Sequence, residues 1–294
     1  MAGPLGRVVL EERSRCVRRV ELDAFSPHEA YLKRTGRLPI LKTLRVLLRF
    51  TSPRSPAGRE AILLTRLRRD GLPAAVPLAY GETRILGIPT RSFILTHAVR
   101  GRDLHDLLVG ASPTRRRDLY RLAGDLLGRL HDRGYFHIVR AKDLILTDEG
   151  DGHYPPGVLV LIDREVARPH ARRFSVGRAG HGLARCAAKV LRADVPFDDS
   201  DAAAFTRAYL RASPRVRGRD RRALRRAFTR SLARIRAGHR YRAPRPDAVI
   251  AALPPAPADP CPALQPTETS PLAAPIPADA AVHPNGSRSS HAPQ

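Results

Sequence analysis

Short stretches in the first third of the chain alternate apolar and polar residues, which is the pattern of half-buried strands. Residues 7–22 read RVVLEERSRCVRRVEL, residues 29–34 read EAYLKR, and residues 74–97 alternate in the same way between turns. The segment 55–73, SPAGREAILLTRLRRDGLP, differs because its apolar residues have helical spacing, with Ser-Pro at the start and glycine and proline at the end. We therefore expect a small antiparallel sheet with one helix.

Beyond residue 98 the pattern becomes mainly helical. A short helix is expected over 101–108 and a long amphipathic helix over 115–135, and further helices follow within 172–193 and 198–212. Residues 215–242 contain twelve arginines together with apolar residues at helical spacing. This segment predicts a basic amphipathic helix packed on the body, whose arginines are either solvated or bound to an acidic surface.

Two apolar runs, 144–146 and 158–162, flank a segment rich in glycine and proline, and together they predict a hairpin. Asp143 directly precedes the first run and Asp163 directly follows the second. Both carboxylates are therefore expected at the same open end of the hairpin, where a cation could lie between them. The alternative is that both are ordinary turn or capping residues.

Composition and pattern divide the chain into three parts: a strand-rich part over 1–97, a helical part over 98–242 and a tail over 243–294. In the tail proline, alanine and serine dominate and the periodicity disappears. Such a segment cannot bury enough apolar surface to offset the entropy of ordering it. We expect the tail to be disordered.

The formal net charge is +24, and only four of the 52 basic residues are lysines. Arginine suits bidentate contacts with phosphate and carboxylate groups, so a surface this basic is expected to attract anionic partners. The bias towards arginine can also follow from the base composition of a genome.

Three widely spaced cysteines without a CxxC pair argue against a disulfide framework and against a zinc site. The first residues, MAGPLGRVVLEERSR, carry charges where a signal peptide needs an apolar core. No apolar run approaches the roughly 18 residues of a membrane span. We expect a soluble cytoplasmic protein.

Lys33 is a candidate site residue because lysine is scarce and this one lies in an apolar strand segment beside Tyr31 and Leu32. Glu60 lies near the start of the helix that follows. A lysine and a glutamate so placed can form the ion pair that orients phosphates in kinase-type sites. The alternatives are a strand-edge charge for Lys33 and, for Glu60, an acid favoured by the helix dipole.

The order of these features resembles a protein-kinase-like fold and, more narrowly, the lipopolysaccharide kinase (Kdo/WaaP/InaA) family. The resemblance covers about residues 20 to 215 and implies an α+β fold of two lobes, a small antiparallel-sheet N-lobe and a helical C-lobe. The motifs that carry it are YLKR (31–34), REAILLTRLRRDGLPAAVPLAYGE (59–82), SFILTH (92–97), LGRLHDRGYFH (127–137), AKDLIL (141–146), LIDREVARP (161–169) and FTRAYLRA (205–212).

The resemblance implies that Lys33 contacts the α- and β-phosphates of ATP and that Glu60 holds this lysine. Asp163 matches the family's Mg²⁺-binding aspartate, and Asp143 stands where the family has His or Asn as a second metal-side ligand. Phosphoryl transfer needs mainly positioning and charge neutralisation, which a lysine and divalent ions supply. The cofactors implied are ATP and Mg²⁺, and the acceptor implied is a sugar hydroxyl on an anionic glycolipid.

The chain departs from the family in its catalytic loop. The family has an aspartate there that accepts the proton of the acceptor hydroxyl, but this chain has Ile138 or Val139, neither of which is a base. His137 is the candidate substitute, because imidazole is a competent general base near neutral pH. The usual glycine-rich run over the phosphates is also missing.

These features leave three hypotheses open. The first is an ATP-dependent glycolipid kinase, cytoplasmic and in peripheral contact with the acidic inner membrane. The second is a degenerate pseudokinase that binds nucleotide without catalysis. The third is a basic module that binds nucleic acid or a membrane surface through residues 215–242. Nucleic acid is the less favoured partner, because aromatic residues make up only 5% of the chain.

Overall fold

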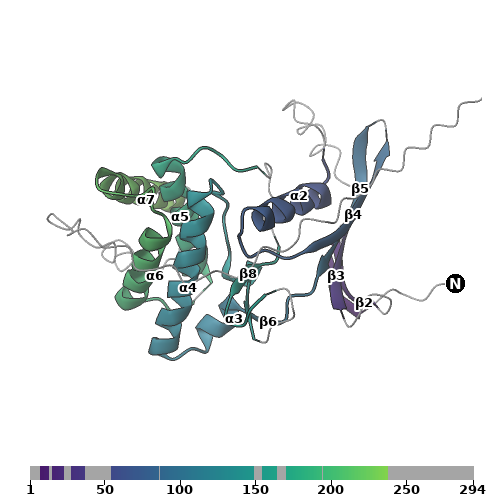
Figure 1. Cartoon of the computed structure of the whole chain (residues 1–294), viewed down its shortest axis with the longest axis horizontal. Coiled ribbons are helices and arrows are strands. Elements are labelled where there is room, and N and C mark those ends of the chain that lie inside the picture. The colour runs from purple at the N-terminus through teal and green to yellow at the C-terminus, as the bar shows by residue number, and fades with distance from the viewer. Residues whose placement is uncertain are drawn as a thin grey trace, which may run out of the picture. The chain divides into compact units, whose positions relative to one another are not determined.

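Five antiparallel strands form a sheet in the N-terminal part of the computed structural model, in the order β1-β2-β3-β5-β4 (Figure 1). The register is continuous through β3, whose Lys33 lies opposite Val17 of β2 and Ile94 of β5. The small antiparallel sheet expected from the alternating pattern is confirmed. The strands are β1 (Arg7–Glu12), β2 (Arg15–Leu22), β3 (His28–Thr35), β4 (Pro77–Ile85) and β5 (Ile88–His97).

The structure describes residues 7–12, 15–22, 28–36, 54–85, 87–148, 154–163, 170–193 and 195–237. All of them belong to the first of two units, which spans Met1–Ala256. The tail predicted to be disordered, 243–294, lies outside the described residues, as do the last residues of the predicted basic helix.

Helix α2 (Pro56–Arg69) packs against β3, β4 and β5, as Figure 1 shows. The Ser55 hydroxyl accepts a hydrogen bond from the Gly58 amide at 3.0 Å, and Pro56 occupies the first helical position, where its missing N–H costs nothing. The leucines of its inner face, such as Leu63 and Leu67, are fully buried. The predicted helix therefore forms where expected and places Glu60 on its buried side.

A second sheet of three strands carries the predicted hairpin. Strand β7 (Leu144–Thr147) pairs antiparallel with β8 (Leu159–Leu161) on one side and with β6 (Gly101–Asp103) on the other. The Leu161 amide and carbonyl also bond to Pro73 and Ala75, just after α2. The hairpin is thereby tied to the segment that follows the N-terminal helix.

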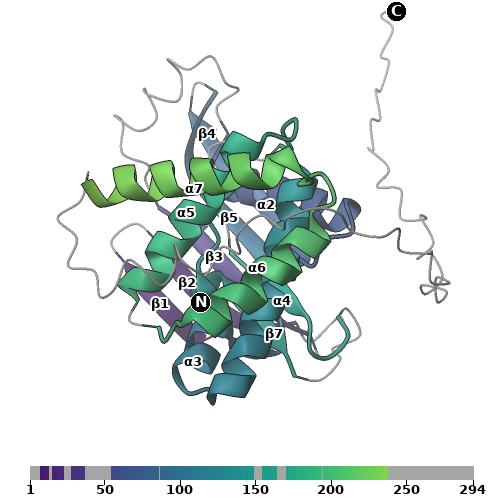
Figure 2. The ribbon, with the colours of Figure 1, turned by 90° about the vertical axis from the view of Figure 1, so that its left-hand side faces the viewer.

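The remaining helices form the helical part of the fold, in which α6 packs on α4 and α7 packs on α5 (Figure 2). Two of these helices begin with a side-chain cap: the Asp198 side chain accepts from the Asp201 amide, and the Ser112 side chain accepts from the Arg115 amide. The helices are α3 (Leu104–Val109), α4 (Pro113–Asp132), α5 (Val176–Arg192), α6 (Asp199–Ala212) and α7 (Arg219–Ala237). Within the described residues, no helix has both the length and the apolarity to cross a bilayer.

Glycines let α4 and α6 approach closely. A Cβ atom added at Gly124 would lie 2.3 Å from the Phe205 carbonyl oxygen, and one added at Gly128 would lie 2.6 Å from that of Tyr209. These neighbours are backbone atoms, so a side chain at either glycine would push the helices apart.

A buried histidine stabilises the base of the helical part. His131 of α4 is 1% exposed, and its Nδ1 lies 2.9 Å from the hydroxyl of Tyr209 on α6. Complete burial, with the nearby His137 as a lesser cause, lowers the pKa of His131 to about 3. The ring is therefore neutral in the folded protein at ordinary pH, and its role is structural.

Replacing Gly124 with alanine is expected to lower the free energy of unfolding by about 2 kcal/mol, because the new methyl group overlaps the α6 backbone. Gly177→Ala is the matched control, since the nearest atom to its added Cβ is the Ser175 Oγ at 3.8 Å. Alanine there is expected to be neutral or to stabilise by up to about 1 kcal/mol. Urea unfolding measures both, and equal effects would contradict the close packing of α4 on α6.

As the pH is lowered, the free energy of unfolding is expected to decrease, and the burial of His131 is one cause. The unfolded ring binds a proton near pH 6.5 and the folded ring only near pH 3, so its contribution is complete above about pH 6.5. Between those values it is lost at about 1.4 kcal/mol per pH unit. His131→Gln, compared with the wild type by urea unfolding from pH 7 to 4.5, is expected to show the shallower decline. Parallel curves would contradict the burial of a neutral ring.

Candidate active site

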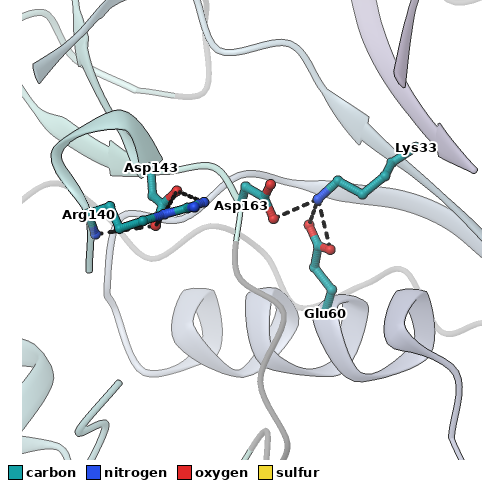
Figure 3. A network of polar contacts seen from close by, with 5 residues as sticks. All are labelled: Lys33, Glu60, Arg140, Asp143 and Asp163. Carbon is teal, nitrogen blue, oxygen red and sulfur yellow. Dashed lines mark hydrogen bonds and ion pairs between the residues drawn. The ribbon is translucent and has the colours of Figure 1, made fainter. Parts of the chain in front are cut away.

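Lys33 and Glu60 form a partly buried ion pair between the sheet and α2 (Figure 3). The Lys33 Nζ donates to both carboxylate oxygens of Glu60, at 2.7 Å and 2.9 Å. Glu60 is 2% exposed. It is therefore a buried partner of the lysine and not a surface acid favoured only by the helix dipole. The lysine is held because its strand lies inside the sheet and the helix packs across that sheet.

Asp163 joins this pair from the far part of the sequence. It lies two residues after β8, and its Oδ1 accepts a hydrogen bond from the Lys33 Nζ at 2.6 Å (Figure 3). Its side chain is 25% exposed, compared with 14% for Lys33 and 3% for Glu60. Asp163 is the more solvent-exposed of the two carboxylates that bind Lys33. Carboxylate oxygens are the ligands that Mg²⁺ prefers, so the residues present fit a divalent ion at Asp163.

Asp143 lies at the same end of the hairpin, as expected, and the Ile162 amide donates to its carbonyl oxygen at 3.0 Å. Its carboxylate, however, is bound by Arg140 (Figure 3). The Arg140 Nε lies 3.0 Å from each carboxylate oxygen, Nη2 lies 2.6 Å from Oδ1, and the Arg140 amide donates to Oδ2 at 3.2 Å. Asp143 is 2% exposed, so the arginine supplies the charge that its burial requires.

Arg140 places a fixed positive charge beside the Lys33 cluster. Hydrogen bonding to Asp143 raises the pKa of Arg140 above its ordinary value, and the charges of Asp143 and Asp163 act in the same direction. The side chain is 50% exposed, so the guanidinium is anchored on Asp143 and still faces solvent. The sequence offered one signal for this pair, the i, i+3 spacing in a tight turn, but one arginine among so many did not stand out.

The loop residues that stand where the resembling family has an acid are packing residues. Val139 is 7% exposed, and its amide donates to the Cys186 Sγ of α5 at 3.4 Å, while Ile138 packs against the core. The Nε2 atom of His137 is buried, and its ring centroid lies 6.2 Å from that of Tyr135. The loop is thus held by the core, and the role of His137 as a base stays a prediction.

A separate group of possible metal ligands lies at the start of α3. Side-chain atoms of Asp103, His105 and Asp106 come within 4.8 Å of one another. The Asp103 carboxylate caps the helix by accepting from the Asp106 amide at 2.9 Å. Hydrogen bonding to His105 and the charge of Lys142 contribute to lowering the pKa of Asp106. These contacts are those of a helix cap.

The comparisons with known proteins agree with this geometry. The model of the lipopolysaccharide kinase (Kdo/WaaP) family matches residues 6–209. Among solved structures, one described as WaaP in complex with acyl carrier protein matches with a TM-score of 0.50 and 20% sequence identity, over 79% of this chain and 89% of that chain. At that identity the likeness shows the fold alone, and it confirms the protein-kinase-like α+β architecture. No curated protein sequence matches the chain.

Replacing Arg140 with alanine is expected to lower the free energy of unfolding by about 2 kcal/mol, because Asp143 would be left buried without its cation. Asp143→Asn in the same background is expected to restore part of the loss, because the buried charge disappears. Arg121→Ala is the control, since its ion pair with Asp118 is exposed and worth at most about 1 kcal/mol. Urea unfolding of the variants measures the coupling, and an Arg140→Ala loss no larger than the control would contradict it.

Proposed function

Because the chain belongs to the lipopolysaccharide kinase (Kdo/WaaP) family, we propose that it transfers the γ-phosphate of ATP to a sugar hydroxyl of an anionic glycolipid. The observation that carries this proposal is the ion-paired lysine, which joins a strand, a helix glutamate and the aspartate that follows β8. Phosphoryl transfer depends mainly on positioning and charge neutralisation, and this cluster supplies groups for both.

In this proposal Lys33 binds the α- and β-phosphates, and Glu60 holds the lysine in place. Asp163 holds Mg²⁺, which when bound neutralises phosphate charge and orients the γ-phosphate. Lys33 lies 2.6 Å from Asp163, so nucleotide binding requires the lysine to move from this carboxylate towards the phosphates. Glu60 grips the lysine through both oxygens and can retain it during that exchange.

We assign Arg140 to the stabilisation of charge on the transferring phosphoryl group. A guanidinium suits phosphate oxygens, and Asp143 orients this one without covering it. The prediction that Asp143 binds a second metal ion remains open to test, but Arg140 would first have to release its carboxylate. The arrangement therefore favours one metal ion at Asp163 and a fixed arginine beside it.

Transfer to a hydroxyl also requires a group that accepts the hydroxyl proton. Neither Ile138 nor Val139 can accept it, and His137 is the remaining candidate in the loop. In a loose transition state the hydroxyl loses its proton late, so a distant or weak base lowers the rate without abolishing it. The missing acid is also the observation that favours the second candidate function, a pseudokinase that binds ATP without transferring phosphate.

The proposed acceptor determines where the protein would work. ATP is supplied in the cytoplasm, and a glycolipid acceptor is anchored in a bilayer, so we place the protein on the cytoplasmic face of the inner membrane. The solved relative forms a complex with acyl carrier protein. Acyl carrier protein is accordingly a second partner to test.

Mg-ATP is expected to raise the melting temperature of the wild type by several degrees, and Lys33→Met and Asp163→Asn are each expected to abolish most of that shift. Lys189→Ala, an exposed lysine of α5, is the matched control and should keep it. A full shift in both site variants would overturn the site.

Transfer of labelled γ-phosphate to a lipopolysaccharide inner-core glycolipid distinguishes the two candidate functions. Transfer that Lys33→Met lowers at least 100-fold supports the kinase. A wild-type thermal shift without any transfer, across acceptors carrying Kdo or heptose, supports the pseudokinase.

A further inference from the structure

Two side chains of the helical part bind the end of α2. Asp70 is the residue at which this helix ends, and its carboxylate accepts a hydrogen bond from the Tyr135 hydroxyl at 2.6 Å. The carbonyl oxygen of the next residue, Gly71, accepts a hydrogen bond from Arg129 Nη2 of α4 at 2.7 Å. Both bonds join residues far apart in the sequence, so they fix the end of α2 to the helical part.

The residues that follow α2 also support the strand before Asp163. The Leu161 amide donates to the Pro73 carbonyl oxygen at 3.1 Å, and the Leu161 carbonyl oxygen accepts from the Ala75 amide at 2.8 Å. Both Leu161 and Ala75 are buried, so water does not compete for these bonds. We call residues 70–75 the joint. The joint ties β8, which leads to the proposed metal ligand, to the end of the helix that carries the glutamate.

Tyr135 connects the joint to the loop that carries Arg140. It is 2% exposed, and its amide donates to the Leu130 carbonyl oxygen of α4 at 2.9 Å. Residues 136–139 lead from it to Arg140 and to the turn in which this arginine binds Asp143. Because Tyr135 stands at the start of the loop, its bond to the joint sets where the loop begins relative to α2.

The Tyr135 hydroxyl has a stronger partner than its burial alone requires. Tyr120 of α4 is also buried, and its hydroxyl donates to a neutral group, the Pro196 carbonyl oxygen, at 3.0 Å. Tyr135 donates to a carboxylate at 2.6 Å, and hydrogen bonds to charged acceptors are roughly twice as strong as neutral ones. Burial, and then the bond to Asp70, raise the pKa of Tyr135, so the hydroxyl keeps the proton that it donates.

The bond from Arg129 to the joint is less rigid. The Arg129 side chain is 38% exposed and also lies 4.0 Å from Asp125. A long solvated side chain loses much conformational freedom when it holds one geometry, whereas a tyrosine has few rotatable bonds before its hydroxyl. Arg129 also lies within α4, whereas Tyr135 directly precedes the loop. The placement of the loop therefore depends mainly on the tyrosine.

We propose that Tyr135, through its bond to the joint, is a positioning residue that places Arg140 relative to Lys33. The inference rests on the proposed function, in which Lys33 binds the α- and β-phosphates and Arg140 binds the transferring phosphoryl group. Without the hydroxyl, the Leu161 backbone bonds still hold β8 on the joint, and the lysine cluster keeps its geometry. The loss therefore displaces Arg140 alone and weakens the contact with the γ-phosphate.

Calorimetric binding of Mg-ADP and of Mg-ATP to the full-length protein reads the two sides of the site separately. The wild type is expected to bind Mg-ATP about tenfold more tightly than Mg-ADP, since only ATP has the γ-phosphate that Arg140 contacts. Tyr135→Phe is expected to weaken Mg-ATP binding about fivefold and to change Mg-ADP binding by less than about twofold. Equal weakening of both nucleotides, or of neither, would overturn the proposal.

Matched variants separate positioning from a general loss of stability. Tyr120→Phe removes the hydroxyl bond of a similarly buried tyrosine and is expected to leave both affinities within about twofold of the wild type. Asp70→Asn retains an acceptor for the Tyr135 hydroxyl and is expected to keep most of the preference for ATP. Asp70→Ala is expected to lose that preference as Tyr135→Phe does. An effect of Tyr120→Phe as large as that of Tyr135→Phe would contradict a positioning role.

The wild-type result distinguishes a failure of this proposal from a failure of the proposed function. A wild type that binds neither nucleotide has no nucleotide site, and both are overturned. A wild type that prefers ATP, with a Tyr135→Phe variant that keeps this preference, retains the site and loses only the positioning role. Equal wild-type binding of ATP and ADP would contradict the role of Arg140 and the proposal with it.

Circular dichroism melting shows whether each variant is folded. If Tyr135→Phe is not, Asp70→Ala takes its place, because Asp70 is partly exposed at the end of α2 and its replacement leaves the core unchanged. The same loss of preference for ATP is then expected, and its absence would overturn the proposal.

Discussion

The ion pairs of Lys33 hold together segments that are far apart in the chain. Glu60 lies 27 residues from the lysine and Asp163 lies 130 residues from it, and both carboxylates lie within 3 Å of one ammonium group. Such a contact needs the sheet, α2 and the β7–β8 hairpin to be correctly placed at once. The backbone hydrogen bonds between Leu161 and the segment after α2 help to hold these elements in place.

The ion pair of Arg140 with Asp143 stabilises the neighbouring turn in the same way. A buried carboxylate needs a positively charged partner, and Arg140, three residues before Asp143 in the same turn, supplies it. Once satisfied, Asp143 orients a cation that remains open to solvent. Positively charged side chains, Lys33 and Arg140, then lie on either side of Asp163 (Figure 3). In the proposed function this arrangement binds the polyphosphate, and the missing loop acid affects only the proton transfer.

Local patterns predicted the hairpin and placed Asp163 at its open end, because an apolar run that ends just before an aspartate marks the end of a strand. The sequence indicated the pairing of Lys33 with Glu60 only as one of two alternatives, since neither residue alone excludes a surface role. Two features escaped prediction for a physical reason. The Arg140–Asp143 bond depends on the backbone of a tight turn, and the contact of Gly124 with α6 depends on how two helices approach.

The exposed basic residues of α5 and α7 also differ in how far the sequence predicted them. The arginines of α7 were visible in the sequence, whereas the basic side of α5 becomes apparent only when burial shows which side of the helix faces solvent. The lysine cluster is the part of the fold on which the enzymatic proposal depends.

The most direct measurement is the affinity for ATP by calorimetry, with Mg²⁺ and with EDTA, for the wild type and Asp163→Asn. If Asp163 holds the metal beside Lys33, Mg²⁺ should strengthen wild-type binding at least tenfold, a gain of about 1.4 kcal/mol, and should leave the variant unchanged. A variant that keeps the full Mg²⁺-dependent gain would contradict the assignment of this cluster as the nucleotide site.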